Sequence, residues 1–345
     1  MSAIFDPGAI EKKIDSLLSR TGRAGQRTSL LTLIAVCHRN DATAFTALID
    51  TLFGRRPLRI IRIENGYEGD TQVDVSARCL PSHGGEEICF QEIVIYNGMD
   101  KQGLMPSLWS PLVIRDLPVI LFWRESLSSL FTLVRDSELT IDKCILDTTD
   151  CPDIGINPID CYARLSQVFL EPGHGEEHIP LADLTWKRLA FERYHTAALF
   201  DPPAALPALQ ATALLTFRGF PQAEALLLLF WISARLGLSF LSREGAVYHF
   251  RNQKGSTVSA SIEVRKTDDR SLTFSTRDGI VHSVAFLSQD QVRFITPQRR
   301  WEERRKRPSL DHFLIEEIDT ISHDPLYDDT MRALSVAGKK MHADT

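Results

Sequence analysis

The sequence predicts an α/β protein of two domains, with a mixed sheet and flanking helices in the N-terminal domain and a C-terminal α+β domain with an antiparallel sheet. Three features predict this fold class. Val119 to Trp123 is an unbroken apolar run, which is typical of a strand covered on both faces. Residues 73–79 alternate apolar and polar side chains, which indicates a half-exposed strand. Residues 222–236 are apolar almost all round, which predicts a buried helix.

The N-terminal domain begins with a parallel βαβ unit. Residues 29–37 predict a buried strand, Asp41 can cap a helix that continues to Leu52, and residues 58–63 predict a second strand. Such a unit brings its two strands side by side in one sheet, both running in the same direction.

A hairpin follows the βαβ unit. The alternating strand over residues 73–79 reaches a turn at residues 82–85, and residues 88–96 continue as its antiparallel partner. Because parallel and antiparallel neighbours then occur together, we expect a mixed sheet.

The buried strand at residues 119–123 is followed by charged side chains. Pro118 fits at the first residue of this strand, where its missing N–H costs least. Arg124 and Glu125 emerge at the carboxyl end, and Asp147 leaves the next predicted strand at the same edge of the sheet. Open α/β sheets place their ligand sites at this edge.

We expect the domain boundary at Asp201-Pro202-Pro203, because these residues and Pro207 break a helical pattern.

In the second domain, Asp278-Gly279 predicts a type I′ hairpin turn. The predicted domains are residues 1–200 and 201–345, the latter with the buried helix at 222–236, antiparallel strands at 246–296 and C-terminal helices.

Composition excludes several classes of function. The chain carries 39 basic and 45 acidic residues, a formal net charge of −6, which gives no general attraction to nucleic acid or acidic membranes. The longest apolar run, Ala225 to Ile232, is far shorter than the roughly 20 residues of a membrane span. No signal peptide is evident at the N-terminus, so we expect a cytoplasmic protein without a membrane partner.

The six cysteines form no C-x-x-C motif. A cytoplasmic setting favours reduced, mostly buried thiols. Two pairs, Cys79/Cys89 and Cys151/Cys161, are each ten positions apart and could meet in space.

Motifs for catalysis, metals and cofactors are weak or missing. His174 to His178 spells H-x-x-E-H, but the prolines and glycines around it favour a loop over a zinc-binding helix. G-x-G-x-x-G after a strand, the P-loop and G-x-S-x-G are all absent, so we expect no cofactor and no metal. A cluster of Asp116, Arg124, Glu125 and Asp147 could support acid–base chemistry, although charges at strand ends are more often solvated.

Two cationic stretches remain. Arg299 to Arg307 contains six basic residues and Trp301, a pattern that suits a polyanion or an ordinary surface segment. Residues 181–199 predict a helix that contains Trp186, Arg188 and Arg193, and Trp and Arg often anchor interfaces. Packing of the aromatic side chains against the sheet is the competing interpretation.

Several segments in this order resemble the OpcA family, the glucose-6-phosphate dehydrogenase assembly proteins. They are residues 56–61, 111–124, 183–201, 235–237 and 324–327. The sequence departs from the family pattern at Arg56 (usually histidine), at Phe122 (often tryptophan) and at residues 190–192 (where Pro-Trp is more usual).

The resemblance implies a protein that is not an enzyme. It would bind glucose-6-phosphate dehydrogenase and support its active oligomer as an allosteric activator, thereby controlling NADPH supply from the oxidative pentose phosphate pathway. The positions that match the family pattern, and so become candidate partner-binding residues, are Asp116, Pro118, Trp123, Arg124, Asp183, Trp186, Arg188, Arg193 and Asp201.

Two other functions stay open. An enzyme or sensor for a sugar phosphate would use Arg124, Arg188 and Arg193 as anion clamps. A nucleic-acid binder would use Arg299 to Arg307, although the acidic chain makes a nucleic-acid partner the weakest of the three hypotheses. Whether a small-molecule effector binds as well is left open by the sequence.

Overall fold

The computed structural model describes residues 6–20, 29–53, 55, 57–81, 87–98, 105–136, 141–151, 153–154, 157–171, 178–264 and 269–343. Arg56, the turn at 82–85 and residues 174–177 of the H-x-x-E-H stretch lie outside this part. The chain forms two compact units. Unit 1 comprises Met1–Cys151, Ile179–Ala182 and Leu310–Ser322, and unit 2 comprises Pro152–His178, Asp183–Ser309 and His323–Thr345. The predicted boundary at residue 201 stays a prediction.

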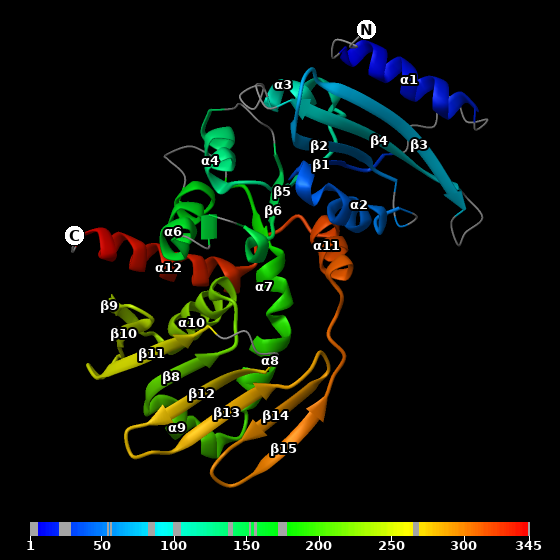
Figure 1. Ribbon diagram of the computed structural model, residues 1–345. Coiled ribbons are helices and arrows are strands. Elements are labelled where there is room, and N and C mark those ends of the chain that lie inside the picture. The colour runs from blue at the N-terminus through cyan, green and yellow to red at the C-terminus, as the bar shows by residue number, and fades with distance from the viewer. Residues whose placement is uncertain are drawn as a thin grey trace. The chain divides into compact units, whose positions relative to one another are not determined.

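The sheet of unit 1 has seven strands in the order β3 (Gln72–Pro81), β4 (Glu87–Gly98), β2 (Arg59–Tyr67), β1 (Thr32–His38), β5 (Val119–Arg124), β6 (Lys143–Leu146) and β7 (Leu181–Asp183) (Figure 1). β1 is parallel to β2 and β5, β2 is parallel to β4, and β5 is parallel to β6. β3 is antiparallel to β4. The predicted mixed sheet, hairpin and parallel βαβ unit are therefore confirmed.

Helices cover both faces of this sheet. They are α1 (Pro7–Arg20), α3 (Met105–Trp109) and α4 (Leu127–Asp136) on one face, and α2 (Ala42–Asp50) and α11 (Leu310–Asp319) on the other. Figure 1 shows α1 lying across β3 and β4. On the α2 face, the rings of Phe45 and Phe122 are 5.1 Å apart. On the opposite face, Trp123 donates from Nε1 to the carbonyl of Ser126, just before α4.

β5 is the central buried strand that the apolar run predicts. No residue from Val119 to Trp123 exposes more than 4% of its surface. Full burial of each large apolar side chain contributes about 1.5–3 kcal/mol. β5 is thus the strand around which both helical layers pack.

Charged residues also lie inside the sheet, and Arg59 in β2 shows how they are accommodated. Arg59 is 2% exposed. Its guanidinium donates to Glu11 Oε1 at 2.6 Å, Gln91 Oε1 at 2.9 Å and the Leu112 carbonyl at 2.7 Å. A buried cation is tolerated only when it is paired and hydrogen-bonded in this way.

Lys143 in β6 holds α11 against the sheet. Lys143 is 1% exposed and Glu317 in α11 is 4% exposed, and the two form a buried ion pair. The Lys143 ammonium also donates to the carbonyls of Glu317 at 2.8 Å and Thr320 at 2.5 Å. The last carbonyls of α11, which lack partners inside the helix, thereby receive a cation.

Unit 2 contains an eight-stranded sheet in the order β15 (Arg300–Arg304), β14 (Gln291–Ile295), β13 (Val281–Phe286), β12 (Arg270–Thr276), β8 (Thr212–Arg218), β11 (Thr257–Glu263), β10 (Val247–Arg251) and β9 (Ser239–Glu244). All neighbours are antiparallel except the parallel pair β8 and β11. The predicted antiparallel sheet is confirmed, apart from the parallel pair β8 and β11. Every second residue is buried on one face, whereas the other face exposes Leu214, Val281 and Ile295.

The helices of unit 2 are α6 (Pro158–Phe169), α7 (Leu184–Arg188), α8 (Ala190–Ala198), α9 (Leu206–Gln210), α10 (Gln222–Leu236) and α12 (Pro325–Ala343). α10 has the bounds that its apolar sequence predicts, and Gly237 ends it in the left-handed conformation at φ 61°. Only a residue without a side chain adopts this φ freely. α10 packs against α12, which also packs against α6.

Two local predictions were wrong. Residues 181–199 form β7, α7 and α8 instead of one helix, because Asp183 is extended and its side chain accepts from the Thr185 backbone N–H, which starts α7 there. The turn at Asp278-Gly279 is not type I′, since only Gly279 has a positive φ and Thr276 N donates to the Ile280 carbonyl across a longer loop.

The expectation of free thiols was wrong for one pair. Cys79 and Cys89 face each other in the antiparallel ladder of β3 and β4, with their Cα atoms 4.0 Å apart, and form a disulfide. Cys37 and Cys144 are buried thiols and Cys151 and Cys161 are half-buried thiols, none of them in a disulfide. Burial and the nearby Glu64 raise the pKa of Cys37 to about 12, and burial raises the pKa of Cys144.

No helix within the described ranges is both long enough and apolar enough to cross a membrane.

Replacing Lys143 with Met leaves the Glu317 carboxylate buried without its cation. We expect a loss of about 3–5 kcal/mol in the free energy of unfolding, because a buried charge loses its partner. Urea denaturation measures this loss. Lys12→Met on the exposed surface of α1 is the matched control, and we expect no more than about 0.5 kcal/mol for it. Equal effects of the two substitutions would contradict the anchoring role of Lys143.

Alkylation at pH 8 should separate the cysteines into three groups, because the thiolate is the reactive form. We expect Cys151 and Cys161 to react in the folded protein, and Cys37 and Cys144 only after unfolding. Cys79 and Cys89 should need both a reductant and alkylating reagent. Mass spectrometry of the labelled peptides gives the result, and labelling of Cys79 without reductant would show that the disulfide does not form.

Candidate functional site

The carboxyl ends of the parallel strands in unit 1 form the edge where the sequence predicts a site. The strand order changes direction here, since β1 is followed in the chain by β2 on one side and, later, by β5 on the other. Ligands of open α/β sheets bind at such a switch point. The structure confirms that Arg124, Glu125 and Asp147 reach this edge, where they line one small cavity together.

A row of polar residues crosses the strand ends. Asn97 in β4, Asn65 in β2 and His38 in β1 are in register, and Glu125 follows β5 in the same row. Asn97 donates to Asn65 Oδ1 at 2.9 Å, and Asn65 donates to Glu125 Oε1 at 3.3 Å. Burial raises the pKa of Glu125, while the Asn65 hydrogen bond and the nearby His38 oppose this increase.

Sequence reasoning missed His38, Asn65 and Asn97. A signal for two of them exists, because β2 and β4 both reach Asn-Gly near their carboxyl ends. Asn65 and Asn97 are 3% and 0% exposed, and the hydrogen bond between them offsets part of the cost of their burial. An Asn-Gly pair otherwise suggests a turn, which is why the pattern alone did not identify a buried row.

The cavity at this edge has a volume of about 20 Å³. Such a space holds roughly one water molecule. The residues that line it are Asp41, Trp123, Arg124, Glu125, Leu127, Leu146, Asp147, Thr148 and Cys151. In the described part of the chain, no group of three or more His, Cys, Asp or Glu residues could hold a metal ion. This cavity is therefore too small for a cofactor or a metabolite.

Asp116 and Pro118 lie before β5 at the opposite end of that strand. Asp116 is exposed and has a φ of 66°, a left-handed conformation that is uncommon outside glycine. Pro118 is half-buried, and its carbonyl accepts from the Thr32 backbone N–H at 2.8 Å. Neither residue takes part in the row of polar side chains at the carboxyl edge.

A second cluster forms in unit 2 around Trp186, which is 1% exposed. Trp186 donates from Nε1 to Asp324 Oδ2 at 2.8 Å, and its ring lies 5.5 Å from the ring of Tyr327. The Arg193 guanidinium carbon lies 3.4 Å from the centre of the Trp186 ring, and Arg193 donates to the Trp186 carbonyl at 2.6 Å. Burial lowers the pKa of Arg193 to about 10. Trp186 is thus a core residue.

The cluster joins two of the segments that carry the family resemblance. Asp183 begins α7 as its cap, and Asp324 begins α12, where its carboxylate also accepts from the backbone N–H groups of Leu326 and Tyr327. Arg188 is half-buried and donates to Thr185 Oγ1 at 3.2 Å, and Asp201 is exposed after α8.

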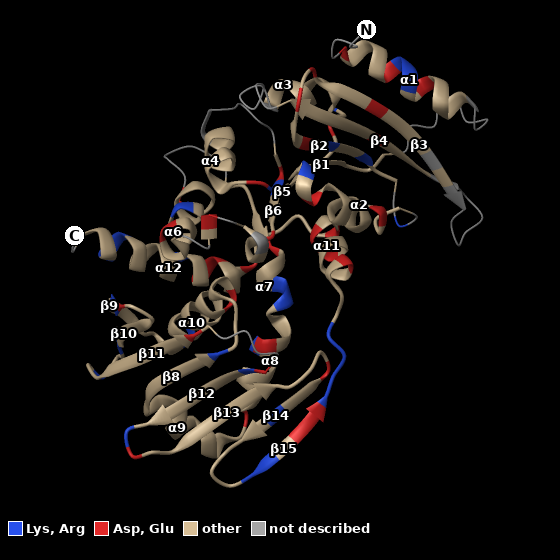
Figure 2. Cartoon of the chain, viewed as in Figure 1, with Lys and Arg blue, Asp and Glu red and all other residues tan. Residues whose placement is uncertain are grey.

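The arginine-rich segment around the end of β15, coloured blue in Figure 2, contacts other parts of unit 2. Arg307 donates to Glu192 Oε1 at 2.7 Å, and Glu192 is completely buried. The Arg305 guanidinium carbon lies 4.1 Å from the centre of the Tyr194 ring. These contacts leave fewer cations for a polyanion than the sequence alone suggests.

Neither unit assembles the predicted clamp of three arginines. Arg124 belongs to unit 1, whereas Arg188 and Arg193 belong to unit 2. The Arg193 guanidinium is already occupied by Trp186. Within unit 2, Arg193 is therefore not positioned to bind an anion.

Comparison with known families gives two matches. Residues 50–161 match the model for the N-terminal domain of a glucose-6-phosphate dehydrogenase subunit. Residues 179–331 match the model for the C-terminal domain of the same kind of protein. The two matches follow one another in the chain and together cover most of it.

Curated relatives are named OpcA, and their names link them to the OxPP cycle. The protein from Synechococcus elongatus is 26% identical over 232 residues, which cover 65% of this chain and 48% of that protein. The protein from Nostoc punctiforme is 27% identical over 229 residues, which cover 62% of this chain and 47% of that protein. The matched region thus spans about half the length of these relatives.

Among solved structures, a Gfo/Idh/MocA family oxidoreductase from Vibrio cholerae superposes with a TM-score of 0.44 and 11% identity, covering 91% of this chain and 98% of that one. The TM-score is below 0.5, so this likeness supports no inference about the present protein. The two family matches, in contrast, identify the family of this chain. The chain belongs to the OpcA family, whose domain models describe a glucose-6-phosphate dehydrogenase subunit.

Proposed function

We propose that this protein is a non-catalytic subunit that binds glucose-6-phosphate dehydrogenase and supports its active oligomer. Its role would be to control NADPH supply from the oxidative pentose phosphate pathway. The observation that carries the proposal is the match of both parts of the chain, in order, to the two domain models of a dehydrogenase subunit.

The carboxyl edge of the unit 1 sheet supports a binding role over a catalytic one. The switch point between β1 and β5 is where an α/β enzyme would hold its ligand. Here Asn65, Asn97 and Glu125 bond to one another, and the cavity lined by Arg124, Glu125 and Asp147 has a volume of about 20 Å³, which is too small for a metabolite. This arrangement supports binding of a protein partner over catalysis at this edge.

Activation by such a protein follows from linkage. A protein that contacts the active conformation of the dehydrogenase more strongly than other conformations shifts the population toward it. A coupling free energy of about 1–3 kcal/mol changes substrate affinity about 5–150-fold. The activator needs no chemistry of its own for this effect.

The candidate partner-binding residues fall into two groups by exposure. Asp116 and Asp201 are exposed, and Pro118, Arg124, Arg188 and Arg193 are half-buried, so each presents part of its side chain at the surface. Trp123 and Trp186 are each 1% exposed, so they would act by holding the segments around them. The assignment of all nine residues to the partner surface stays a prediction.

Adding the purified chain to the cognate dehydrogenase should lower its KM for glucose 6-phosphate by about 5–150-fold, because activation depends on differential binding. Steady-state kinetics and sedimentation velocity of the mixture measure affinity and oligomeric state. Unchanged KM, kcat and oligomeric state would exclude the proposed function.

Two substitutions should distinguish a residue that touches the dehydrogenase from one that only stabilises unit 2. Arg188→Gln should weaken activation even where the variant is fully folded, although it removes the hydrogen bond to Thr185 Oγ1 and can lower the Tm. Trp186→Phe removes the donor to Asp324, so we expect a loss of about 1–3 kcal/mol in the free energy of unfolding. At a temperature where Trp186→Phe is fully folded, we expect this variant to activate the dehydrogenase as the unmodified chain does.

Glu244→Gln, at the exposed end of β9, is the control for the loss of a surface charge. We expect it to activate the dehydrogenase as the unmodified chain does. If Arg188→Gln also activates normally, Arg188 does not belong to the partner surface.

A further inference from the structure

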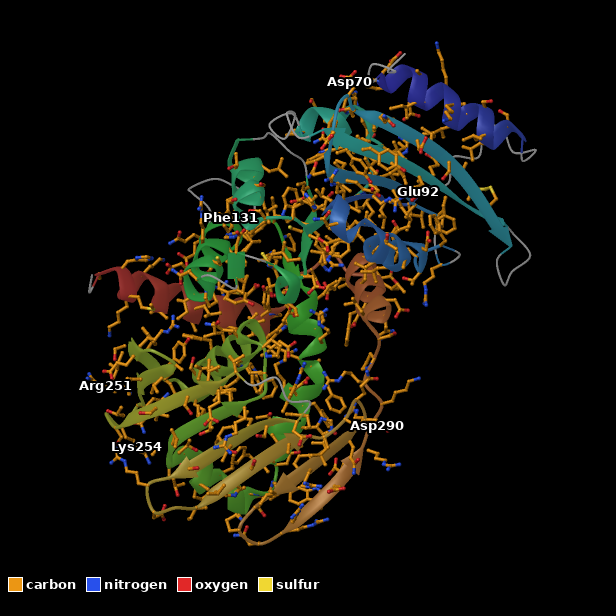
Figure 3. The ribbon with its side chains drawn as sticks, in the orientation of Figure 1. Asp70, Glu92, Phe131, Arg251, Lys254 and Asp290 are labelled. Carbon is orange, nitrogen blue, oxygen red and sulfur yellow. A yellow bond between two sulfur atoms is a disulfide. The ribbon has the colours of Figure 1, made fainter. Side chains whose placement is uncertain are left out.

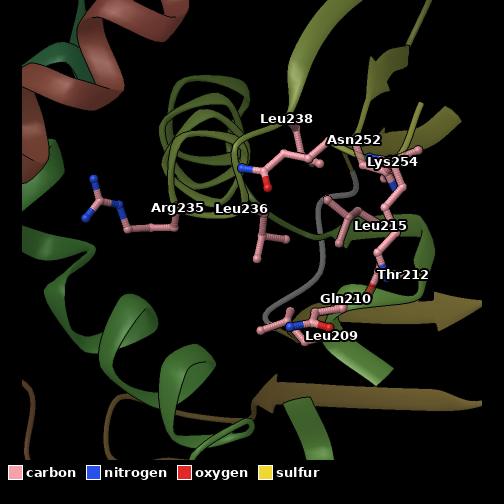
Figure 4. Close-up of a pocket in the computed structure, with 11 residues that line it drawn as sticks. Leu209, Gln210, Thr212, Leu215, Arg235, Leu236, Leu238, Asn252 and Lys254 are labelled. Atoms are coloured by element: carbon pink, nitrogen blue, oxygen red, sulfur yellow. The ribbon is translucent and has the colours of Figure 1, made fainter. Parts of the chain in front are cut away.

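Unit 2 contains a surface pocket of about 360 Å³ between α9, the end of α10 and the turn that joins β10 to β11 (Figure 4). A neighbouring hollow of about 450 Å³ shares Gln210, Thr212, Asn252 and Lys254 with this pocket. We call the two together the α9 groove. Both volumes fall within the range of small-molecule sites, roughly 300–1,000 Å³.

The α9 groove combines an apolar wall with polar side chains on the facing turns. The apolar residues are Leu209, Leu215, Leu236, Leu238 and Val258. Aliphatic side chains of this kind pack against the carbon skeleton of a ligand, while polar groups fix its orientation.

Two cations line the α9 groove without a partner among the described residues. Lys254 lies in the β10–β11 turn, Arg277 lies in the β12–β13 turn, and both are exposed. The carboxylate nearby, Asp278, accepts from the Thr276 hydroxyl. A third cation, Arg235, is paired with Asp329 at 2.6 Å, and Figure 4 shows it directed away from Lys254.

Amide donors accompany these cations. Asn252 Oδ1 accepts from the backbone N–H groups of Lys254 at 3.0 Å and Ser256 at 2.9 Å. Because both partners are donors, the oxygen of Asn252 must face them, and its NH₂ group is left for another acceptor. Gln210, at the end of α9, adds a second exposed amide to the lining.

We propose that the α9 groove binds a small hydroxylated anion of the sugar phosphate class. Lys254 and Arg277 would contact the phosphate through charge-assisted hydrogen bonds. Asn252 and Gln210 would bind the sugar hydroxyls, and the leucine side chains would pack against the carbon skeleton. This inference does not depend on the proposed dehydrogenase partner, because the groove lies within unit 2 alone.

Isothermal titration calorimetry of the full chain tests the inference, with glucose 6-phosphate, inorganic phosphate and glucose as separate probes. We expect glucose 6-phosphate to bind more tightly than inorganic phosphate or glucose. Inorganic phosphate lacks the sugar hydroxyls and carbon skeleton, and glucose lacks the phosphate. Absence of heat with glucose 6-phosphate would overturn the inference. Equal affinity for inorganic phosphate would overturn it as well, because the amides and the leucines would then contribute nothing.

Lys254→Gln and Arg277→Gln should each weaken binding of glucose 6-phosphate roughly tenfold or more, as expected for a lost hydrogen bond to a charged group. The matched control is Arg251→Gln, an exposed residue near the same turn that does not line the groove (Figure 3). All three side chains are exposed, so we expect unchanged Tm values. If Arg251→Gln loses as much affinity, the anion is attracted by surface charge in general. That outcome would contradict binding in the α9 groove.

Discussion

The sheet of unit 1 depends on one constraint, which is that a strand covered on both faces has no water to satisfy its polar side chains. An unpaired charge inside such a sheet is very costly, so every buried charge must be paired. Arg59 meets this requirement through Glu11 and Gln91, and Lys143 meets it through Glu317. Each pair also connects the sheet to a helix, so that pairing of the buried charge and packing of α1 or α11 stabilise each other.

The same constraint acts at the carboxyl edge of the sheet. Asn65, Asn97 and Glu125 close this edge by bonding to one another. In an enzyme with this architecture, the polar groups would instead be directed toward a ligand. At this edge the three side chains satisfy one another within the sheet.

Much of the fold was predictable because burial leaves a clear pattern in the sequence. The apolar run of β5, the alternation in β3 and the all-round apolar surface of α10 each identify an element. Contacts between distant segments were not predictable. Lys143 and Glu317 are 174 positions apart, and nothing local in the sequence connects them.

At the candidate sites, too, positions set by strand direction were predictable, whereas contacts between distant segments were not. Arg124 and Asp147 were correctly placed at the sheet edge, because strand direction alone determines this position. Whether Trp186 belongs to the core or to the surface could not be decided, because Trp is favoured in both places. The structure answers this question through Asp324, which lies 138 residues further along the chain.

The residues that carry the family resemblance therefore fall into two kinds, those packed inside unit 2 and those exposed at its surface or in a turn. Trp186, Arg193 and Asp324 contact one another inside unit 2, so their agreement with the family pattern indicates a shared internal arrangement. Such residues do not identify the partner surface, because an internal arrangement accounts for them without a partner. Asp116 has an exposed carboxylate on a left-handed backbone, where few residue types fit well. A match at such a position is explained by the turn as readily as by a partner, so only substitution by Asn, which keeps the turn and removes the charge, separates the two causes.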